Sequence, residues 1–392
     1  MRFETNQKQL LLLLLTVILI SFNLRPSMAA IGPLLSSIQK DIPLNFTFAS
    51  LLTMLPVMAM GLAMFVGLKL GSKLGKHNTI SLSLLLISLA SLARLWVDSS
   101  ISLILTAVLS GCGIAFIQAI MPSIIKARFT RNTALYMGFY VTGIMGGATL
   151  ATSTAPTIAK HFSWQLGLAI WAGLGVAALL CWFSQRHVIN HLPNQILASV
   201  DKHSSNSRSW LLAIFFGLGT AAYTCVLAWF SPYYEEMGYT PQQSGFLLAY
   251  LTVTEVVAGL VFPALANFSQ DRRKVLFIVL VLAVIGFIGI NLLPTTLTLM
   301  WTTLLGLGIG GLFPMTLIIT MDHIKDPDRA GNLAGFVQGV GYFIASLSPL
   351  AAGFIRDQLN SFSLAWWFIC ALMVLLMFIT LKFNPKNYIH HY

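Results

Sequence analysis

The chain has 392 residues, of which 57% are hydrophobic and only 9% are Asp, Glu, Lys or Arg, and its formal net charge is +11. A soluble domain carries about 25% charged residues, so this composition excludes an ordinary water-soluble protein and indicates an outer surface that faces lipid. The positive charge does not indicate nucleic-acid binding, because the cations lie in short clusters between apolar runs.

Apolar segments long enough to cross a bilayer, which takes about 20 residues, recur along the whole chain. The sequence predicts twelve such spans, at 10–35, 47–68, 79–97, 101–125, 135–157, 164–184, 210–232, 243–266, 275–293, 297–320, 331–354 and 363–383. The first span follows Arg2 and Lys8, as in a signal peptide. Its apolar stretch exceeds the roughly 7–15 residues of a signal sequence, so we expect a retained helix.

The loop charges predict the orientation of these spans. Eighteen of the 23 Lys and Arg residues fall in loops on one side of the predicted membrane, four fall on the other side, and Arg25 lies inside the first span. Loops rich in Lys and Arg stay in the cytoplasm, so both termini are expected there. The only long polar connection, 185–209, is expected to be a cytoplasmic linker between two six-helix halves, 1–184 and 210–392.

The two halves resemble each other at an offset of 195 to 199 residues. Pro33 in the first span matches Pro232 in the seventh, and the Gly111-Cys112-Gly113 run matches Gly306-Leu307-Gly308. Six spans repeated about an axis along the membrane normal are typical of secondary transporters, which bind substrate near mid-membrane between the repeats.

Arg25 is the clearest candidate for function. It lies far inside the first span, in the run Asn23-Leu24-Arg25-Pro26, where a proline interrupts the helix. A charge at that depth costs at least about 2.5–3.5 kcal/mol, and such residues mark substrate or ion pathways. The repeat matches Arg25 with Thr224, so the other half has no equivalent cation. The sequence therefore predicts an anion site at Arg25.

Glu255 is the second charge without a partner in the repeat, since its counterpart is Val57. It lies midway along the predicted span 243–266. Two interpretations stand at this point. Glu255 either pairs with Arg25 and neutralises it, which is a structural role, or it exchanges a proton during transport and so releases Arg25 to an anion.

Uncharged polar side chains at mid-depth complete the candidate substrate-binding set. Gln118 and Gln338 could orient a substrate, or could join helices by hydrogen bonds worth roughly 0.6 kcal/mol each. Asn23 lies two residues from Arg25 and so faces another side of the helix, which is more typical of a residue that caps the break or bonds a neighbouring helix. Tyr223 and Tyr140 could line the site, although aromatic residues in spans more often pack.

The sequence contains no motif of an enzyme. It has no Gly-rich loop ending in Gly-Lys-Ser/Thr, no His-Glu-x-x-His zinc motif and no recognisable nucleophile. We therefore expect neither catalysis nor a cofactor nor a metal site. A sensor would need a sizeable output domain, and the longest predicted loop has only about 26 residues.

Several runs resemble those of one transporter family. They are Asn23-Leu24-Arg25-Pro26, Gly32-Pro33-Leu34-Leu35, Gln118-Ala119 with Met121-Pro122-Ser123, Asp271-Arg272-Arg273-Lys274, Gly306-Leu307-Gly308 with Gly310-Gly311, and Gln338-Gly339 with Gly341. The chain resembles the major facilitator superfamily and, within it, the cyanate-transporter family. Ser72 stands where the superfamily loop carries an Asp, and at Glu255 a Gln is equally expected.

The resemblance implies an all-α membrane protein with twelve transmembrane helices in two six-helix halves. It further implies a monomeric permease of the bacterial inner membrane that moves a small anion such as cyanate by alternating access. Arg25 would attract the anion, and Gln118 and Gln338 would orient it. The alternative is an exporter of small drug-like compounds of the nitroimidazole type on the same fold.

Overall fold

The computed structural model describes residues 7–129, 133–186, 189, 206–266, 268, 271–324 and 327–390. All regular structure in these residues is helical, which confirms the all-α fold class. The predicted linker lies largely outside the described residues, as do the loop cations Arg2, Arg131, Lys202 and Lys325, and the side chain of Ser72 is also not described.

The helices of the N-terminal half run from α1 to α9. Their bounds are α1 Gln7–Phe22, α2 Pro26–Ala29, α3 Ile31–Asp41, α4 Phe46–Leu74, α5 Lys76–Ala93, η1 Arg94–Trp96, α6 Ser100–Arg128, α7 Thr133–His161, α8 Trp164–Ala169 and α9 Trp171–Phe183. The C-terminal half contains α11 Ser207–Glu236, α12 Pro241–Ala266, α13 Arg273–Leu292, α14 Thr298–Asp322, α15 Pro327–Leu359, α16 Ser363–Thr380 and η3 Pro385–His390.

These helices account for the twelve predicted spans. Within the described residues, eleven helical segments are long and apolar enough to cross a membrane. The twelfth, α7, is a 29-residue helix over the predicted fifth span. Several helices extend beyond their predicted ends, because polar residues continue the helix outside the apolar region. For example, α4 reaches Leu74 and α15 covers Pro327–Leu359.

The first predicted span is broken into three helices instead of one. Helix α1 ends at Phe22, the single turn of α2 begins at Pro26, and α3 continues to Asp41. Proline has no backbone N–H to donate, and its ring disfavours helical geometry in the preceding residue, so the chain leaves the helix before Pro26. Arg25 is the N-cap residue of α2 and therefore lies directly at this break.

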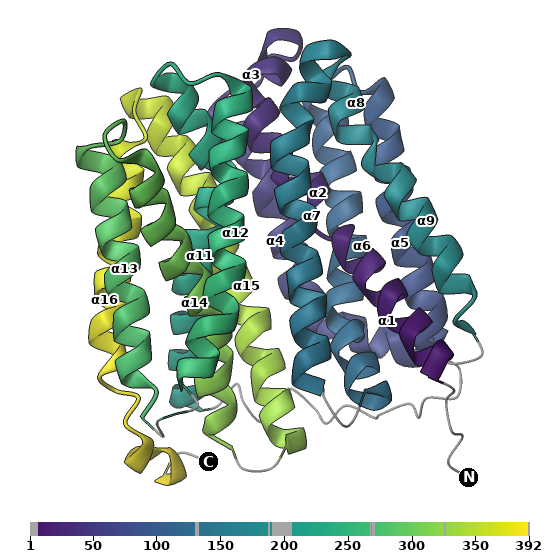
Figure 1. Cartoon of the computed structure of the whole chain (residues 1–392), viewed down its shortest axis with the longest axis vertical. Coiled ribbons are helices and arrows are strands. Elements are labelled where there is room, and N and C mark those ends of the chain that lie inside the picture. Colours follow the sequence, from purple (N-terminus) through teal and green to yellow (C-terminus); the bar gives the residue numbers. More distant parts are fainter. Residues whose placement is uncertain are drawn as a thin grey trace.

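The two halves stand side by side and meet along two helix pairs (Figure 1), α4 with α15 and α7 with α12. Glycines allow the helices to approach closely at both contacts. A Cβ atom added to Gly61 of α4 would lie 2.9 Å from the carbonyl oxygen of Gly339 in α15, and one added to Gly245 of α12 would lie 2.4 Å from that of Thr152 in α7. Small residues at such crossings are typical of membrane helix packing.

The internal repeat is visible in the packing of its glycines. Gly111 of α6 lies against Pro56 of α4, and its counterpart Gly306 of α14 lies against Thr254 of α12. The second glycine of each pair faces the next helix in the same way, Gly113 against Ser83 of α5 and Gly308 against Ala283 of α13. The two halves therefore pack their second, third and fourth spans alike.

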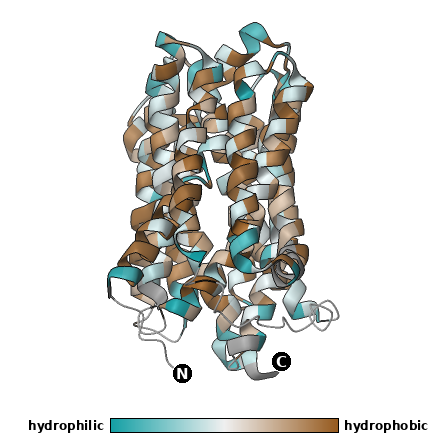
Figure 2. Ribbon diagram, turned by 90° about the vertical axis from the view of Figure 1, so that its right-hand side faces the viewer, coloured by the Kyte–Doolittle hydropathy of each residue, from teal (hydrophilic) through white to brown (hydrophobic). Residues whose placement is uncertain are grey.

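The outer surface is apolar, as lipid contact requires (Figure 2). On α5, for example, the exposed large hydrophobic side chains are four leucines at helical spacing, whereas several serines are buried. The leucines are Leu82, Leu85, Leu89 and Leu92. The interior of the bundle is largely apolar but also holds the polar groups, whereas the surface that faces lipid is apolar.

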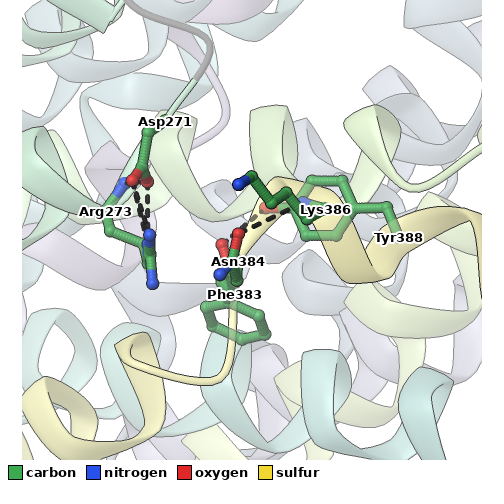
Figure 3. Close-up of polar contacts among 6 residues, drawn as sticks. All are labelled: Asp271, Arg273, Phe383, Asn384, Lys386 and Tyr388. Atoms are coloured by element: carbon green, nitrogen blue, oxygen red, sulfur yellow. Dashed lines mark hydrogen bonds and ion pairs between the residues drawn. The ribbon is translucent and has the colours of Figure 1, made fainter.

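The first described residues and η3 lie at the same end of the molecule (Figure 1), which we call the terminal face. Polar contacts order the short segments there (Figure 3). Asp271, before α13, accepts hydrogen bonds from the Arg273 guanidinium, which holds the pKa of that carboxyl below its usual range. The Tyr388 hydroxyl donates to the Phe383 carbonyl at 3.0 Å, and burial raises the pKa of Tyr388 to about 12.

Hydrogen bonds between the halves lie at the opposite face. Asp357, near the end of α15, accepts from the backbone N–H of Thr47 at 2.8 Å and that of Phe46 at 3.1 Å, and so caps the start of α4. The side chain of Gln242 donates to the carbonyl of Pro156 at 3.2 Å. Both contacts join the halves, so this conformation is closed at the opposite face.

Candidate binding site between the halves

Arg25 is buried at the helix break, with 6% of its surface exposed. Its Nη1 atom lies 4.0 Å from the sulfur atoms of both Met28 and Met60, and its Nε has no hydrogen-bond partner. Thioether sulfur is only a weak acceptor. The guanidinium therefore retains most of its capacity to donate hydrogen bonds.

Tyr223 of α11, in the C-terminal half, contacts this charge. The Cζ atom of Arg25 lies 5.3 Å from the centroid of the Tyr223 ring. A cation over an aromatic face gains about 0.5–2 kcal/mol, more when the pair is desolvated. The Tyr223 hydroxyl is buried and has no hydrogen-bond partner. Arg25 and Tyr223, both sequence candidates, therefore meet across the interface between the halves.

Two further buried tyrosines interact with the same cation. Tyr140 of α7 and Tyr342 of α15 are 3% and 4% exposed, and both interact electrostatically with Arg25. The Tyr140 hydroxyl has no hydrogen-bond partner. The sequence interpretation missed Tyr342. Its signal was its position four residues after Gln338, which places both side chains on one face of α15.

Glu255 of α12 interacts electrostatically with Arg25 but does not touch it. Glu255 is 4% exposed, and neither of its carboxylate oxygens has a hydrogen-bond partner. The three ion pairs among the described residues are Arg272–Asp322, Arg273–Asp271 and Arg356–Glu236. A direct Arg25–Glu255 ion pair, one of the two interpretations from sequence, is therefore not formed in this conformation.

The two glutamines are less clearly connected to Arg25. Gln118 of α6 is half-buried, and its Oε1 has no hydrogen-bond partner. Gln338 is also half-buried, and its Nε2 donates at 3.3 Å to the Ala334 carbonyl of its own helix. Within the described residues, no hydrogen bond joins either glutamine to Arg25. Gln338 shares one face of α15 with Tyr342, which follows it by four residues.

Asn23 stabilises the helix break through its side-chain amide. Its Nδ2 donates to the carbonyl of Leu19 at 2.8 Å and to that of Leu174 in α9 at 3.4 Å. Backbone groups freed by a break must find partners in neighbouring segments, because the hydrocarbon core holds no water. The amide nitrogen of Asn23 is thus engaged away from Arg25, although its Oδ1 is buried without a partner.

The residue that the repeat matches with Arg25 has a different role. The Thr224 hydroxyl lies 3.0 Å from the Ala345 carbonyl and 2.9 Å from the Ser348 hydroxyl, both in α15. It therefore ties α11 to α15 inside the C-terminal half. At this position of the repeat, a cation occurs in the N-terminal half and a threonine in the C-terminal half.

The assembled site consists of a guanidinium and tyrosyl hydroxyls from both halves. In the described residues, no three His, Cys, Asp or Glu side chains are grouped to hold a metal ion. A guanidinium has five N–H donors and no acceptor, and a phenol hydroxyl without a partner can also donate. Such a set suits a small anion with several acceptor atoms, and a planar one can be held at two points by the guanidinium.

Comparisons with known proteins identify the family of the chain. The model of the Major Facilitator Superfamily matches residues 14–347. The cyanate transport protein CynX of Escherichia coli (strain K12) is 38% identical over 96% of this chain and 98% of that protein. The 2-nitroimidazole transporter of the same organism is 25% identical over 91% of each chain.

Solved transporter structures share the fold. The D-xylose-proton symporter superposes with a TM-score of 0.75 at 14% identity, covering 96% of this chain and 98% of that one. A bacterial homolog of the lysosomal transporter Spinster, in an inward-facing and unoccupied conformation, superposes with a TM-score of 0.76 at 14% identity, covering 99% and 98%.

Proposed function

Because the chain belongs to the major facilitator superfamily, and to the same family as the cyanate transport protein CynX, we propose that it is a secondary active transporter of a small anion such as cyanate. It moves the anion across the bacterial inner membrane by alternating access. The 38% identity over nearly the full length of both proteins supports the choice of substrate.

Within the candidate site, one observation supports the proposal. Arg25 is a buried cation whose Nε is unpartnered and whose Nη1 meets only thioether sulfur, and it faces Tyr223 of the other half. An unpaired buried charge is costly, and an anion that binds here offsets that cost. Since the two residues belong to different halves, an anion held between them is bound by both halves at once. Rocking of the halves about this point then changes the side from which it is accessible.

We assign the terminal face to the cytoplasm, following the distribution of Lys and Arg in the loops. The closed opposite face then makes this an inward-facing conformation. Segments 1–184 and 210–392 act as the two moving domains, and 185–209 joins them. The protein works as a monomer in the bilayer, without nucleic acid, cofactor or catalysis.

Glu255 couples transport to protons in this proposal. Its carboxylate is buried without a hydrogen bond, and it acts on Arg25 through space. Protonation of Glu255 removes a competing negative charge from the neighbourhood of Arg25. The site then holds an anion more strongly, so anion and proton travel together.

Export of small drug-like compounds is the second candidate, favoured by the likeness to the 2-nitroimidazole transporter. Nitroimidazoles are planar, and the aromatic side chains near Arg25 could stack on them. The two functions differ in direction and in the charge of the substrate. A resistance phenotype on overexpression, with no cyanate uptake, would select the exporter.

The deciding experiment is uptake of labelled cyanate into proteoliposomes by the wild type and by Arg25→Gln, with folding of both verified by thermal unfolding. We expect saturable uptake by the wild type and its loss in the variant. Equal uptake by both proteins would reject Arg25 as the anion ligand. Absence of uptake by the wild type would reject cyanate, and nitroimidazole export would be measured next.

A further inference from the structure

Arg94 is a second buried cation, and the anion site described above does not include it. The sequence places it among the four cations of the outer loops, but the structure buries it completely, with 0% exposed, at the junction of α5 and η1. An arginine cannot lose its charge in a protein. No acidic group is among its electrostatic partners in the described residues. A buried charge without an acidic partner needs another reason to be there.

The contacts of Arg94 supply that reason. Its Nη1 donates to the backbone carbonyl of Ser27 at 2.9 Å, and its Nε donates to the Thr106 hydroxyl of α6 at 3.2 Å. Ser27 lies in α2, the single turn that follows the helix break. Arg94 thus connects α5 and α6 to the one short helix of the first span.

Helix α2 has few bonds of its own. The N–H groups of Met28 and Ala29 both donate to the carbonyl of Arg25, at 3.0 and 2.9 Å, so this turn is directly joined to the backbone of Arg25. A helix of four residues is not stable by itself and depends on its neighbours. The carbonyl of Ser27 is therefore the point at which a neighbouring side chain fixes the turn that carries Arg25.

We propose that Arg94 is a positioning residue for Arg25, acting through the carbonyl of Ser27. It holds α2 so that the Arg25 guanidinium lies opposite Tyr223 of the other half, where the anion binds. The part of this inference that concerns substrate affinity rests on the proposed anion transport, because it is tested by anion uptake. Its structural part, the control of Arg25 by Arg94, does not depend on which substrate is moved.

A general structural role for Arg94 makes a different prediction. If the side chain only stabilised the fold, replacing it would reduce the amount or the thermal stability of the protein and leave substrate affinity unchanged. A positioning role changes the affinity in the folded fraction. Arg94→Lys separates these cases, because it keeps the buried charge but a single ammonium cannot reproduce the fork that reaches Ser27 and Thr106 together.

The experiment compares Arg94→Lys and Arg94→Gln with Trp182→Phe in proteoliposomes. Trp182 donates its indole N–H to the carbonyl of His77 at 3.0 Å, so the control also removes one buried side-chain bond to backbone in the same half, but away from α2. Arg94→Gln removes the buried charge. It provides a second test of the proposal if Arg94→Lys fails to fold. The first readout is the KM and the maximal rate of anion uptake.

The second readout needs no substrate. Purified protein is treated with the arginine reagent phenylglyoxal, and the modified fraction of Arg25 is measured by mass spectrometry of the peptide that contains it. If α2 loses its anchor, the Arg25 guanidinium becomes more accessible, so its modification should be several-fold faster in both Arg94 variants than in the wild type or in Trp182→Phe.

We expect the KM to rise about 10-fold in Arg94→Lys, the usual effect of one lost buried hydrogen bond, with a much smaller change in maximal rate. The control should keep the KM of the wild type. An unchanged KM together with unchanged Arg25 modification would overturn the proposal. If the wild type moves no cyanate, the proposed function fails by itself, and the modification rate alone decides the role of Arg94.

Discussion

The guanidinium of Arg25 in the N-terminal half lies over the ring of Tyr223 in the C-terminal half, with 5.3 Å between Cζ and the ring centroid. This contact joins the two halves at a position where the internal repeat matches a cation in one half with an uncharged residue, Thr224, in the other. It also leaves Nε without a hydrogen-bond partner. The ring thus supports the cation without neutralising it.

Replacing Tyr223 should separate the contribution of its ring from that of its hydroxyl. Tyr223→Phe keeps the cation–π contact, so we expect a loss in anion affinity of about 1 kcal/mol or less, from one hydrogen bond. Tyr223→Leu also removes the ring and should lose about 0.5–2 kcal/mol more. Competition of unlabelled anion against labelled uptake measures both. Equal affinities for the two variants would show that the ring does not support the cation.

Arg25→Lys should impair transport although it keeps the charge. A planar guanidinium can donate two parallel hydrogen bonds to one anion, and an ammonium cannot. We expect the apparent affinity to fall about 10-fold or more, the effect of one lost charge-assisted bond. Lys40→Arg, at the last turn of α3, is a control with the reverse exchange away from the site. Normal uptake by Arg25→Lys would exclude binding of the anion at two points.

Glu255→Gln should remove the dependence of uptake on a proton gradient. The amide is neutral at every pH, like the protonated acid, so the variant cannot release a proton on the other side. In the wild type, acid outside should accelerate uptake. In the variant, the rate should be the same with and without the gradient. Glu236→Gln, at an exposed ion pair with Arg356, is the control. Gradient-driven uptake by Glu255→Gln would exclude coupling through this residue.

Gly310→Ala should destabilise the C-terminal half. An added Cβ would lie 2.3 Å from the Cα of Glu255 and 2.5 Å from its carbonyl oxygen, so α12 and α14 must separate. Overpacking of this kind costs typically about 1–3 kcal/mol. Thermal unfolding in detergent measures the loss. Gly335→Ala, where no atom lies within 4 Å of the added Cβ, should be neutral or stabilising. Equal stability of the two variants would contradict the close packing.

Asp357→Asn should weaken closure of the opposite face. The carboxylate accepts two backbone N–H bonds from Phe46 and Thr47 at the start of α4, where the helix dipole also favours negative charge. We expect a larger outward-open population, measured by distances between spin labels at Ser99 and Asn360. Asp41→Asn, which makes the same exchange at an acceptor of the Trp164 indole N–H within one half, is the matched control. An unchanged distance distribution in Asp357→Asn would reject this contact as a latch.

The spans and their number follow from the sequence because the bilayer imposes one length and one polarity on every helix. Arg25 and Glu255 could be found in the same way, since a charge in an apolar run is conspicuous. The glycine pairs of α6 and α14 also revealed their common packing through the repeat. All of these signals are carried by the local sequence.

What the sequence could not predict depends on contacts between distant helices. The spacing between Gln338 and Tyr342 places both on one face of α15, but it does not show that this face lies beside Arg25. Arg94 lies near a span end and so resembles a loop cation, because hydropathy does not show that α2 and α6 cover it. Whether Arg25 and Glu255 touch is likewise fixed by the relative position of the halves.

The close fit of Gly310 against the backbone of Glu255 fixes that carboxylate to its own half, while Arg25 moves with the other. The distance between Arg25 and Glu255 therefore changes whenever the halves rock, and it reports the conformation of the transporter. The attraction between the two opposite charges therefore differs from one conformation to the next. In the proposed mechanism, a bound anion or a proton on Glu255 weakens that attraction, so the cargo influences the balance between the conformations.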